Sequence, residues 1–224
     1  NRYFKFIYQR GMVALAASVI LSFYGIYNAK NTVITTYDVI INKSFVDKSL
    51  MVVSDIHLGT VVTKADLTEL SEHAEAIAPS GIILLGDIYD EGTTQDEFDY
   101  SLQVFKILAS KYPVYYIEGN HEIGFQGGSP LREFNIVKKL KEIGIKVLLD
   151  DVTKLDDIYL IGRKDYVVKK REALKDLTEP LDTSKPLILL DHQPHDYELN
   201  EQLGIDLQLS GHTHAGQIFP LNFL

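Results

Sequence analysis

The stretch IILLGDIYD, at residues 82–90, decides how this sequence folds. Four consecutive apolar residues open it, which is typical of a short buried strand. Gly86 and Asp87 follow at once, so a carboxylate stands where the strand ends. Other apolar runs end in polar motifs in the same way: Asp55-Ile56-His57, Gly119-Asn120-His121-Glu122, His192-Gln193-Pro194 and Gly211-His212-Thr213-His214.

Strands and helices alternate along the chain, which predicts an α/β fold with a largely buried sheet. Helices are expected where apolar residues recur at helical spacing, and strands where short apolar runs stand between polar turns. The expected strands are 35–41, 50–54, 82–85, 114–117, 145–149, 158–161, 187–190 and 207–209. The expected helices are 64–78, 95–110, 131–143 and an exposed one at 169–177, with a Gly-rich loop at 126–130 and acidic turns at 150–151 and 156–157.

The polar motifs predict a metal site. Ligands of α/β folds bind where loops leave the carboxyl ends of the strands, and all five motifs fall there. The chain has no cysteine, so any metal must be held by oxygen and imidazole nitrogen, a mixture that suits Mn, Fe, Zn or Co. One Asp-x-His or one Gly-Asp turn is weak evidence, but five such motifs at strand ends are hard to assign to chance.

Composition restricts the partners of the protein. The chain has 224 residues, enough for one sizeable catalytic domain and an appendage, and a formal net charge of −9. This acidic balance disfavours binding of nucleic acid through a broad basic face. It is compatible with a small phosphorylated substrate, because bound divalent cations would invert the local field.

Residues 1–30 are expected to form a membrane anchor. Positions 11–29 carry no charge, and as a helix they would span about 28 Å, close to the thickness of a hydrocarbon core. A cleaved signal peptide and a buried core helix are the alternatives. Basic residues before the apolar run favour an extracytoplasmic catalytic domain, although Lys43 and Lys48 reduce the asymmetry. The chain begins at Asn1 rather than Met, which indicates a fragment or a processed form.

In this order the five motifs resemble the calcineurin-like metallophosphoesterase family, over residues 50–220. The resemblance implies a sandwich of two mixed β-sheets flanked by helices. It implies two divalent metal ions, with Mn, Zn or Fe expected. One ion would be held by Asp55, His57, Asp87 and His214, and the other by Asp87, Asn120, His192 and His212. It further implies that His121 is the general acid and that Asp90 is the carboxylate that orients it.

The same resemblance implies hydrolysis of a phosphoester or pyrophosphate bond by a metal-activated hydroxide. Residues 204–207 and Ala215-Gly216-Gln217 resemble the membrane-associated bacterial branch, some of whose members resemble hydrolases of UDP-diacylglucosamine. A lipid-linked substrate is therefore expected. The catalytic domain is expected at residues 31–224, with the last strands of the family missing after Leu224.

Several interpretations stay open from the sequence alone. A non-catalytic protein could use the same fold for metal binding and partner recognition, and a nuclease could share it. Glu122 is either a partner of the ligands or an ordinary turn carboxylate. His195 either lines the substrate pocket or lies on the surface.

Overall fold

The computed structural model describes residues 2–60, 62–124 and 130–214. The chain divides into two compact units, residues 1–40 and 41–224. Most of the expected loop at 126–130, and the motif at 215–217, lie outside the described residues.

The first unit contains helix α1 (Arg2–Ala29). Its segment Tyr8–Asn28 has a mean hydropathy of 1.5 and no buried residue, so by length and composition it is able to cross a membrane. The strand expected at 35–41 is wrong, because the structure has no regular element there. These β-branched side chains are exposed, and a strand is stable only when a neighbour takes up its backbone hydrogen bonds.

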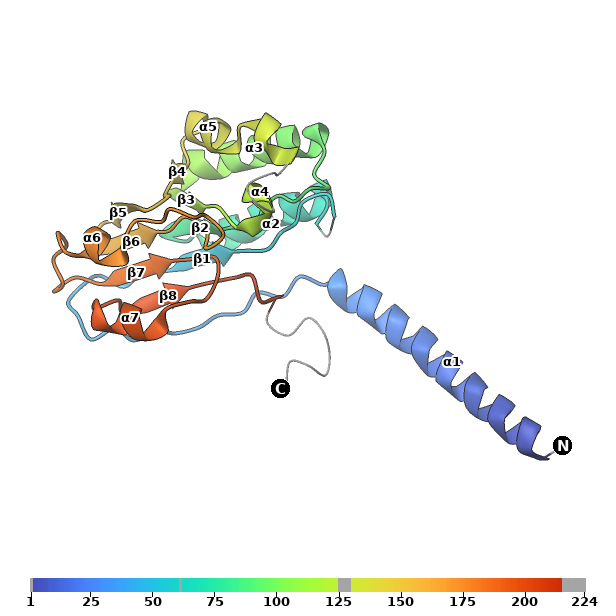
Figure 1. The fold of residues 1–224 in the computed structure, drawn as a ribbon. Helices are drawn as coiled ribbons and strands as arrows, with labels where there is room; N and C mark the ends of the chain where they lie inside the picture. The colour runs from blue at the N-terminus through green and yellow to red at the C-terminus, as the bar shows by residue number, and fades with distance from the viewer. Residues whose placement is uncertain (1, 61, 125–129, 215–224) are drawn as a thin grey trace. The chain divides into compact units, whose positions relative to one another are not determined.

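The second unit contains a parallel sheet of four strands in the order β1-β2-β3-β4 (Figure 1). The strands are β1 (Leu50–Val53), β2 (Gly81–Leu85), β3 (Val114–Ile117) and the short β4 (Lys146–Val147). All described pairings within it are parallel. The carboxyl ends of β1, β2 and β3 therefore meet at one edge of the sheet, where Asp55, Asp87 and Asn120 follow.

A second sheet has the order β5-β6-β7-β8. It consists of β5 (Asp151–Leu155), β6 (Ile158–Gly162), β7 (Leu187–Leu190) and β8 (Leu207–Leu209). β5 runs antiparallel to β6, and the other pairs are parallel, so this sheet is mixed. The sequence interpretation missed β5, since it took the polar residues before β6 for part of a turn.

Helices cover the outer faces of the two sheets (Figure 1). Both α2 (Lys64–Ile77) and α3 (Gln95–Lys111) match the expected segments closely, and a Thr94–Glu97 capping box starts α3. The helix expected at 131–143 is instead a 3₁₀ turn, η2 (Pro130–Phe134), followed by α5 (Ile136–Glu142). Asn135 interrupts it, because its left-handed φ of 50° is incompatible with a continuous right-handed helix.

The remaining helices are short: α4 (Asn120–Ile123), α6 (Leu174–Thr178) and α7 (Tyr197–Gln202). The exposed helix expected at 169–177 is thus shorter than predicted. It is anchored by the buried Leu174, which packs under the second sheet. The sequence interpretation did not include α7.

Alternation of side chains along the strands produces three apolar layers. On β2, Ile82 and Leu84 face the layer of α2, α3 and α5, while Ile83 and Leu85 face the second sheet. On β7 the pattern recurs, with Ile188 in the layer between the sheets and Leu189 in the layer towards α6. Because both faces of these strands are buried, their sequences read as continuous apolar runs. This packing holds the carboxyl ends of both sheets in place.

Candidate metal centre

The turn after β1 presents Asp55 and His57. Both residues have left-handed φ values, 54° and 46°, which non-glycine residues adopt rarely. Backbone hydrogen bonds fix the turn against the next one, since the N–H of Asp55 donates to Gly86 O and that of His57 to Asp87 O, each at 3.1 Å. The turns after β1 and β2 are therefore joined by backbone hydrogen bonds into one rigid unit.

His57 is buried and oriented by Asp90. Its Nδ1 lies 3.5 Å from Oδ2 of Asp90, whose other oxygen accepts hydrogen bonds from Thr60 Oγ1 and the Gly92 N–H. Its Nε2 is buried and has no hydrogen-bond partner among the described residues. Burial lowers the pKa of His57, although the charges of Asp87 and Asp90 oppose this effect. A neutral imidazole with a free Nε2 is the form that binds metals.

Asp87 is the most central carboxylate. It is 1% exposed and has a φ of 49°. Its Oδ1 accepts the N–H of His121 at 2.9 Å, and its Oδ2 lies 2.9 Å from His192 Nε2. Burial opposes ionisation of Asp87, but the contacts with His192 and with the His121 N–H outweigh it and hold its pKa below the ordinary value. Asp87 is thus held as an anion, with Oδ1 facing the His121 N–H and Oδ2 facing His192.

Three glycines let the strand-end loops approach the carboxylates and imidazoles. A Cβ at Gly119 would lie 2.3 Å from Asp87 Oδ1. One at Gly86 would lie 2.6 Å from His192 Nδ1, and one at Gly211 2.3 Å from Asp55 Oδ2. Real Cβ atoms do not approach so closely, so each position requires glycine. The glycines in the motifs are packing requirements of the centre.

Glu122 is a buried residue that holds the backbone of this region in place. Its carboxylate accepts four backbone N–H groups, from Gly119 and from the three consecutive residues 87–89, at 2.7–3.0 Å. Burial and the nearby charge of Asp87 raise the pKa of Glu122 to about 7, and the N–H donors counteract the rise. The sequence left its role open; the structure shows that Glu122 ties the loop after β2 to the loop after β3.

Helix α4 presents Asn120 and His121. The Oδ1 of Asn120 is buried, and no residue that the structure describes forms a hydrogen bond with it. Nδ1 of His121 lies 2.9 Å from Oε2 of Glu91. Burial lowers the pKa of His121, but the hydrogen bond to Glu91 and the charge of Asp87 outweigh it and raise it above the ordinary value. The sequence interpretation named Asp90 as the orienting carboxylate and missed Glu91, its neighbour.

His192 brings the second sheet to the centre. It is completely buried, and its Nδ1–H donates to Leu85 O at 2.8 Å. That hydrogen bond directs Nε2 towards the centre, where it lies 2.9 Å from Asp87 Oδ2. Burial lowers the pKa of His192, but Asp87 outweighs it and raises the pKa to about 9. A cation next to Asp87 would be held by the same carboxylate that now attracts the imidazole.

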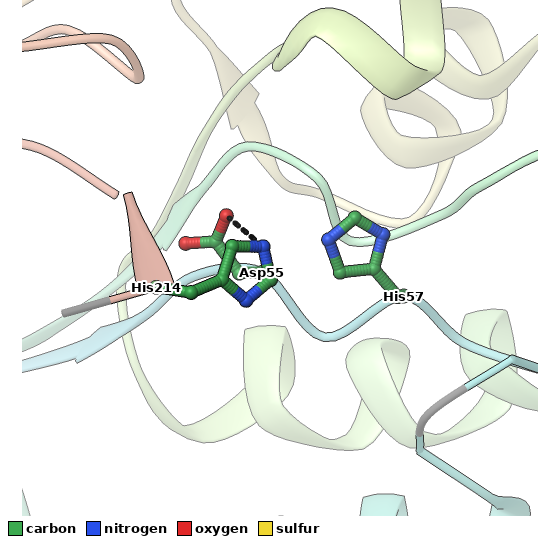
Figure 2. Close-up of side chains that lie close together, drawn as sticks. All are labelled: Asp55, His57 and His214. Atoms are coloured by element: carbon green, nitrogen blue, oxygen red, sulfur yellow. Dashed lines mark ion pairs between the residues drawn. The ribbon is translucent and has the colours of Figure 1, made fainter. Parts of the chain in front are cut away.

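The loop after β8 presents His212 and His214 on the open side. The N–H of His212 donates to both carboxylate oxygens of Asp55, at 3.0 and 3.1 Å. Nε2 of His214 lies 3.6 Å from Asp55 Oδ1, and its side chain is 32% exposed. Figure 2 shows the His214 ring beside the Asp55 carboxylate, and the centre of this ring lies 5.2 Å from that of His57. Both histidines of the loop have left-handed φ values, 66° and 49°.

The structure gathers six of the seven expected metal donors, together with His121, into three overlapping groups. In each group one donor atom per residue lies within 4.8 Å of the others: Asp55 with His57 and His214, His57 with Asp87 and His121, and Asp87 with His192 and His212. Because the groups share His57 and Asp87, they form one continuous centre. Within the described part of the chain, Nε2 of His57, which belongs to two of these groups, and Oδ1 of Asn120 are buried and have no hydrogen-bond partner. Such atoms are costly to bury unless a ligand satisfies them, so the donor set fits divalent metal ions.

The fold and the site together define a class: an α/β protein with two stacked sheets and a nitrogen–oxygen metal centre at the carboxyl ends of their strands. A calcineurin-like phosphoesterase family model matches residues 48–216. The chain belongs to the calcineurin-like metallophosphoesterase family, as its motifs predicted.

Curated relatives agree with this assignment. The chain is 34% identical to an uncharacterized metallophosphoesterase of Helicobacter pylori over 80% of this chain and 48% of that protein. It is 31% identical to one of Campylobacter jejuni, over 100% and 59% respectively. A Danio rerio transmembrane protein with metallophosphoesterase domain is 28% identical over 97% and 52%. The chain therefore spans about half the length of the curated relatives it matches.

A solved structure supports the fold. The crystal structure of TT1561 of Thermus thermophilus matches with a TM-score of 0.53, over 73% of this chain and 80% of that one. At 14% sequence identity this likeness concerns the fold alone.

Proposed function

We propose that this protein is a binuclear phosphoesterase. One ion would be held by Asp55, His57, Asp87 and His214, and the other by Asp87, Asn120, His192 and His212. The observation that supports this arrangement most strongly is that two groups of donors share the buried Asp87, whose Oδ1 accepts the His121 N–H and whose Oδ2 lies 2.9 Å from His192 Nε2. Mn, Zn and Fe suit such a donor set.

Ions held there would polarise a phosphoryl oxygen. They would also lower the pKa of water, so that hydroxide is available to attack phosphorus near neutral pH. The chain would supply the rest. Asp87 and Asp55 fix negative charge on the buried side of the centre, and Glu122 holds the backbone that carries Asp87. Asn120 would offer a neutral oxygen ligand without adding charge that would repel a phosphate.

His121 would donate the proton to the leaving oxygen. It lies in the same group of donors as Asp87 and His57, and its side chain is about one-third exposed, so a substrate can reach it. Its raised pKa favours the protonated form that a general acid requires. Glu91 would hold the imidazole in place through Nδ1, and the other ring nitrogen, Nε2, would donate the proton. Asp90 would act one step away, through His57.

A membrane-bound, lipid-linked or nucleotide-sugar phosphate such as UDP-diacylglucosamine is the substrate class that we favour. Two features support it: helix α1 is long and apolar enough to cross a membrane, and a relative is named as a transmembrane protein. We expect the anchor to comprise residues 1–30 and the catalytic domain residues 31–224. The formal net charge of −9 counts against the nuclease alternative.

The proposal is tested by assaying the full chain on phosphomonoesters, phosphodiesters and nucleotide-sugar pyrophosphates, with Mn and with chelator. We expect hydrolysis that chelator abolishes and Mn restores. Full activity in a metal-free preparation would contradict the proposal. Complete inactivity together with stoichiometric metal binding would favour the non-catalytic, partner-recognition alternative.

The proton donor is tested with His121→Ala. Removal of a general acid should slow esters with poor leaving groups by about 10²–10⁴-fold and affect nitrophenyl phosphates much less, because these leave without protonation. His73→Ala is the matched control, since His73 lies on α2 and pairs with Glu69. Equal losses on both kinds of ester would argue against this role.

A further inference from the structure

We propose that Tyr166 and His195 form a recognition surface for a planar ring carried by the substrate, next to the metal centre. This inference rests on the proposed function and deepens it, since it names a class of phosphate ester: one with a flat, aromatic group close to the phosphorus, as in a nucleotide. Neither residue belongs to the metal-binding motifs, and the sequence left the role of His195 open.

The fold places both residues beside a proposed ligand. β6 and β7 are parallel neighbours, with Gly162 opposite Leu190, so the loops that follow them leave the sheet side by side. The first loop contains Tyr166, and the second contains His192 and His195. A group bound at Tyr166 therefore lies along the edge at which His192 enters the centre.

Polar contacts hold these two loops together. Nε2 of Gln193 donates to both oxygens of Asp165, at 2.9 and 3.2 Å, and both side chains are buried. Nε2 of His195 lies 3.4 Å from Gln193 Oε1. Residues next to His192 in sequence therefore fix the residue next to Tyr166. The aromatic pair is coupled to the metal centre by one connected set of contacts.

The rings themselves form an open stack. Their centroids are 4.0 Å apart with an interplanar angle of 30°. One face of Tyr166 is covered by the imidazole, yet the residue remains 51% exposed. A planar ligand is able to extend such a stack, because aromatic faces attract one another and every nucleobase has such a face.

Arg171 places a positive charge next to the aromatic pair. It forms an ion pair with Asp191, the residue before His192, and its guanidinium carbon lies 5.6 Å from the centre of the Tyr166 ring. Nε of Arg171 and Oδ1 of Asp191 are buried and have no hydrogen-bond partner among the described residues. Each atom is therefore still able to form a hydrogen bond next to the aromatic surface. A fixed cation near the stack favours a ring attached to an anionic phosphate.

The test compares two inhibitors that differ only by the ring: uridine 5′-monophosphate and ribose 5-phosphate, competing with a nitrophenyl phosphate in the Mn-loaded full chain. We expect the nucleotide to bind about tenfold more tightly, the usual value of one aromatic stack. Tyr166→Ala should bring this ratio close to one, whereas Tyr166→Phe should preserve it. Tyr197→Ala removes another exposed tyrosine, on α7, and should leave the ratio unchanged.

A second measurement does not depend on catalysis. The chain contains no tryptophan, so Tyr166→Trp provides a single fluorescent reporter that preserves the stack. In the presence of chelator, uridine 5′-monophosphate should quench this fluorescence at lower concentration than ribose 5-phosphate. Tyr100→Trp, on α3, should show no such difference.

These outcomes separate the two proposals. If the protein has no metal-dependent activity but the reporter still distinguishes the ligands, the proposed function fails and the recognition surface stands. The inference is overturned if wild-type protein binds both inhibitors equally, if Tyr166→Ala keeps the ratio, or if the two reporters respond alike.

Discussion

Asp87 and His214 belong to the same candidate metal centre, but they are held in very different ways. Asp87 is 1% exposed, contacts His192 and receives the His121 N–H, and its backbone is tied to Glu122. His214 is 32% exposed, and its closest described carboxylate contact is to Asp55 at 3.6 Å. The buried side of the centre is thus fixed by contacts within the protein, whereas His214 on the open side is held more loosely. From this difference we expect the buried donors, such as Asp87, to determine metal affinity, and the exposed donors, such as His214, to lie where substrate enters.

The largest effect expected from this comparison is that of Asp87→Asn. Loss of the central charge should weaken metal binding and remove about 4 kcal/mol of transition-state stabilisation, a decrease in kcat/KM of roughly a thousandfold. His214→Ala should cost about tenfold, because its neighbours remain in place. Metal content by elemental analysis and kcat/KM test both. Equal losses would contradict the distinction between the two sides.

Gly119→Ala tests the packing of the buried side without changing a donor. The added methyl group would meet Asp87 Oδ1 at 2.3 Å, so the carboxylate must move. We expect activity to fall about a hundredfold, the usual cost of misplacing a catalytic group by about 1 Å.

Gly144→Ala is the matched control for this variant. Gly144 has a φ of +93°, and no atom lies within 4 Å of the position that an added methyl group would take. The change should therefore cost about 1 kcal/mol of stability through backbone strain and spare activity. Thermal unfolding and kcat/KM separate the two effects. Normal activity of Gly119→Ala would show that the buried side tolerates displacement.

Glu122→Gln weakens the support of the buried side from below. Its new amide N–H groups would face backbone donors that now point at a carboxylate. Metal affinity should fall about 10–100-fold, as for other residues that orient ligands, and the free energy of unfolding by about 2 kcal/mol. Glu142→Gln changes an exposed glutamate on α5 and should do neither. Unchanged Mn binding by Glu122→Gln would remove Glu122 from the account.

The smallest effect, a change in stability alone, is expected at Asp150. Its buried carboxylate accepts hydrogen bonds from Arg163 Nε and the Glu172 N–H, each at 2.9 Å, and so holds the loop that contains Tyr166. Burial alone would raise the pKa of Asp150, but these contacts outweigh it and keep the pKa below the ordinary value. A lowered pKa contributes stability at pH values above the ordinary aspartate pKa and loses it as the pH falls below about 4.

Asp150→Asn should therefore lower the free energy of unfolding by about 2 kcal/mol at pH 7. The difference from wild type should shrink at acidic pH, where the wild-type carboxylate becomes protonated. Urea unfolding at a series of pH values measures it. A difference that is constant with pH would show that the charge of Asp150 has no part in holding the loop.

The sequence predicted the elements that both sheets bury. Strands β2, β3 and β7 were identified because a strand buried on both faces has a continuous apolar sequence. Strand β5 was missed because its mostly polar, partly exposed residues match a turn as well as an edge strand. The strand expected at 35–41 shows the opposite error, since β-branched residues favour a strand only where a partner is present.

The donors were predictable for a related reason: their residue types and positions after strands limit the chemistry. Their supports were not predictable, because hydrogen bonds join residues far apart in sequence. Glu122 is bound to the backbone of residues 87–89, more than 30 positions earlier, and no local pattern shows this. Glu91 and Asp90 are adjacent, and only the fold decides which one reaches His121.

The central claim is that seven donors from both sheets form one centre for two ions. Equilibrium dialysis of the full chain against Mn, followed by elemental analysis, tests it most directly. The account predicts two Mn ions per chain and the loss of both from Asp87→Asn, since this residue serves both groups. A chain that binds no Mn, or one that keeps both ions without the Asp87 carboxylate, would contradict it.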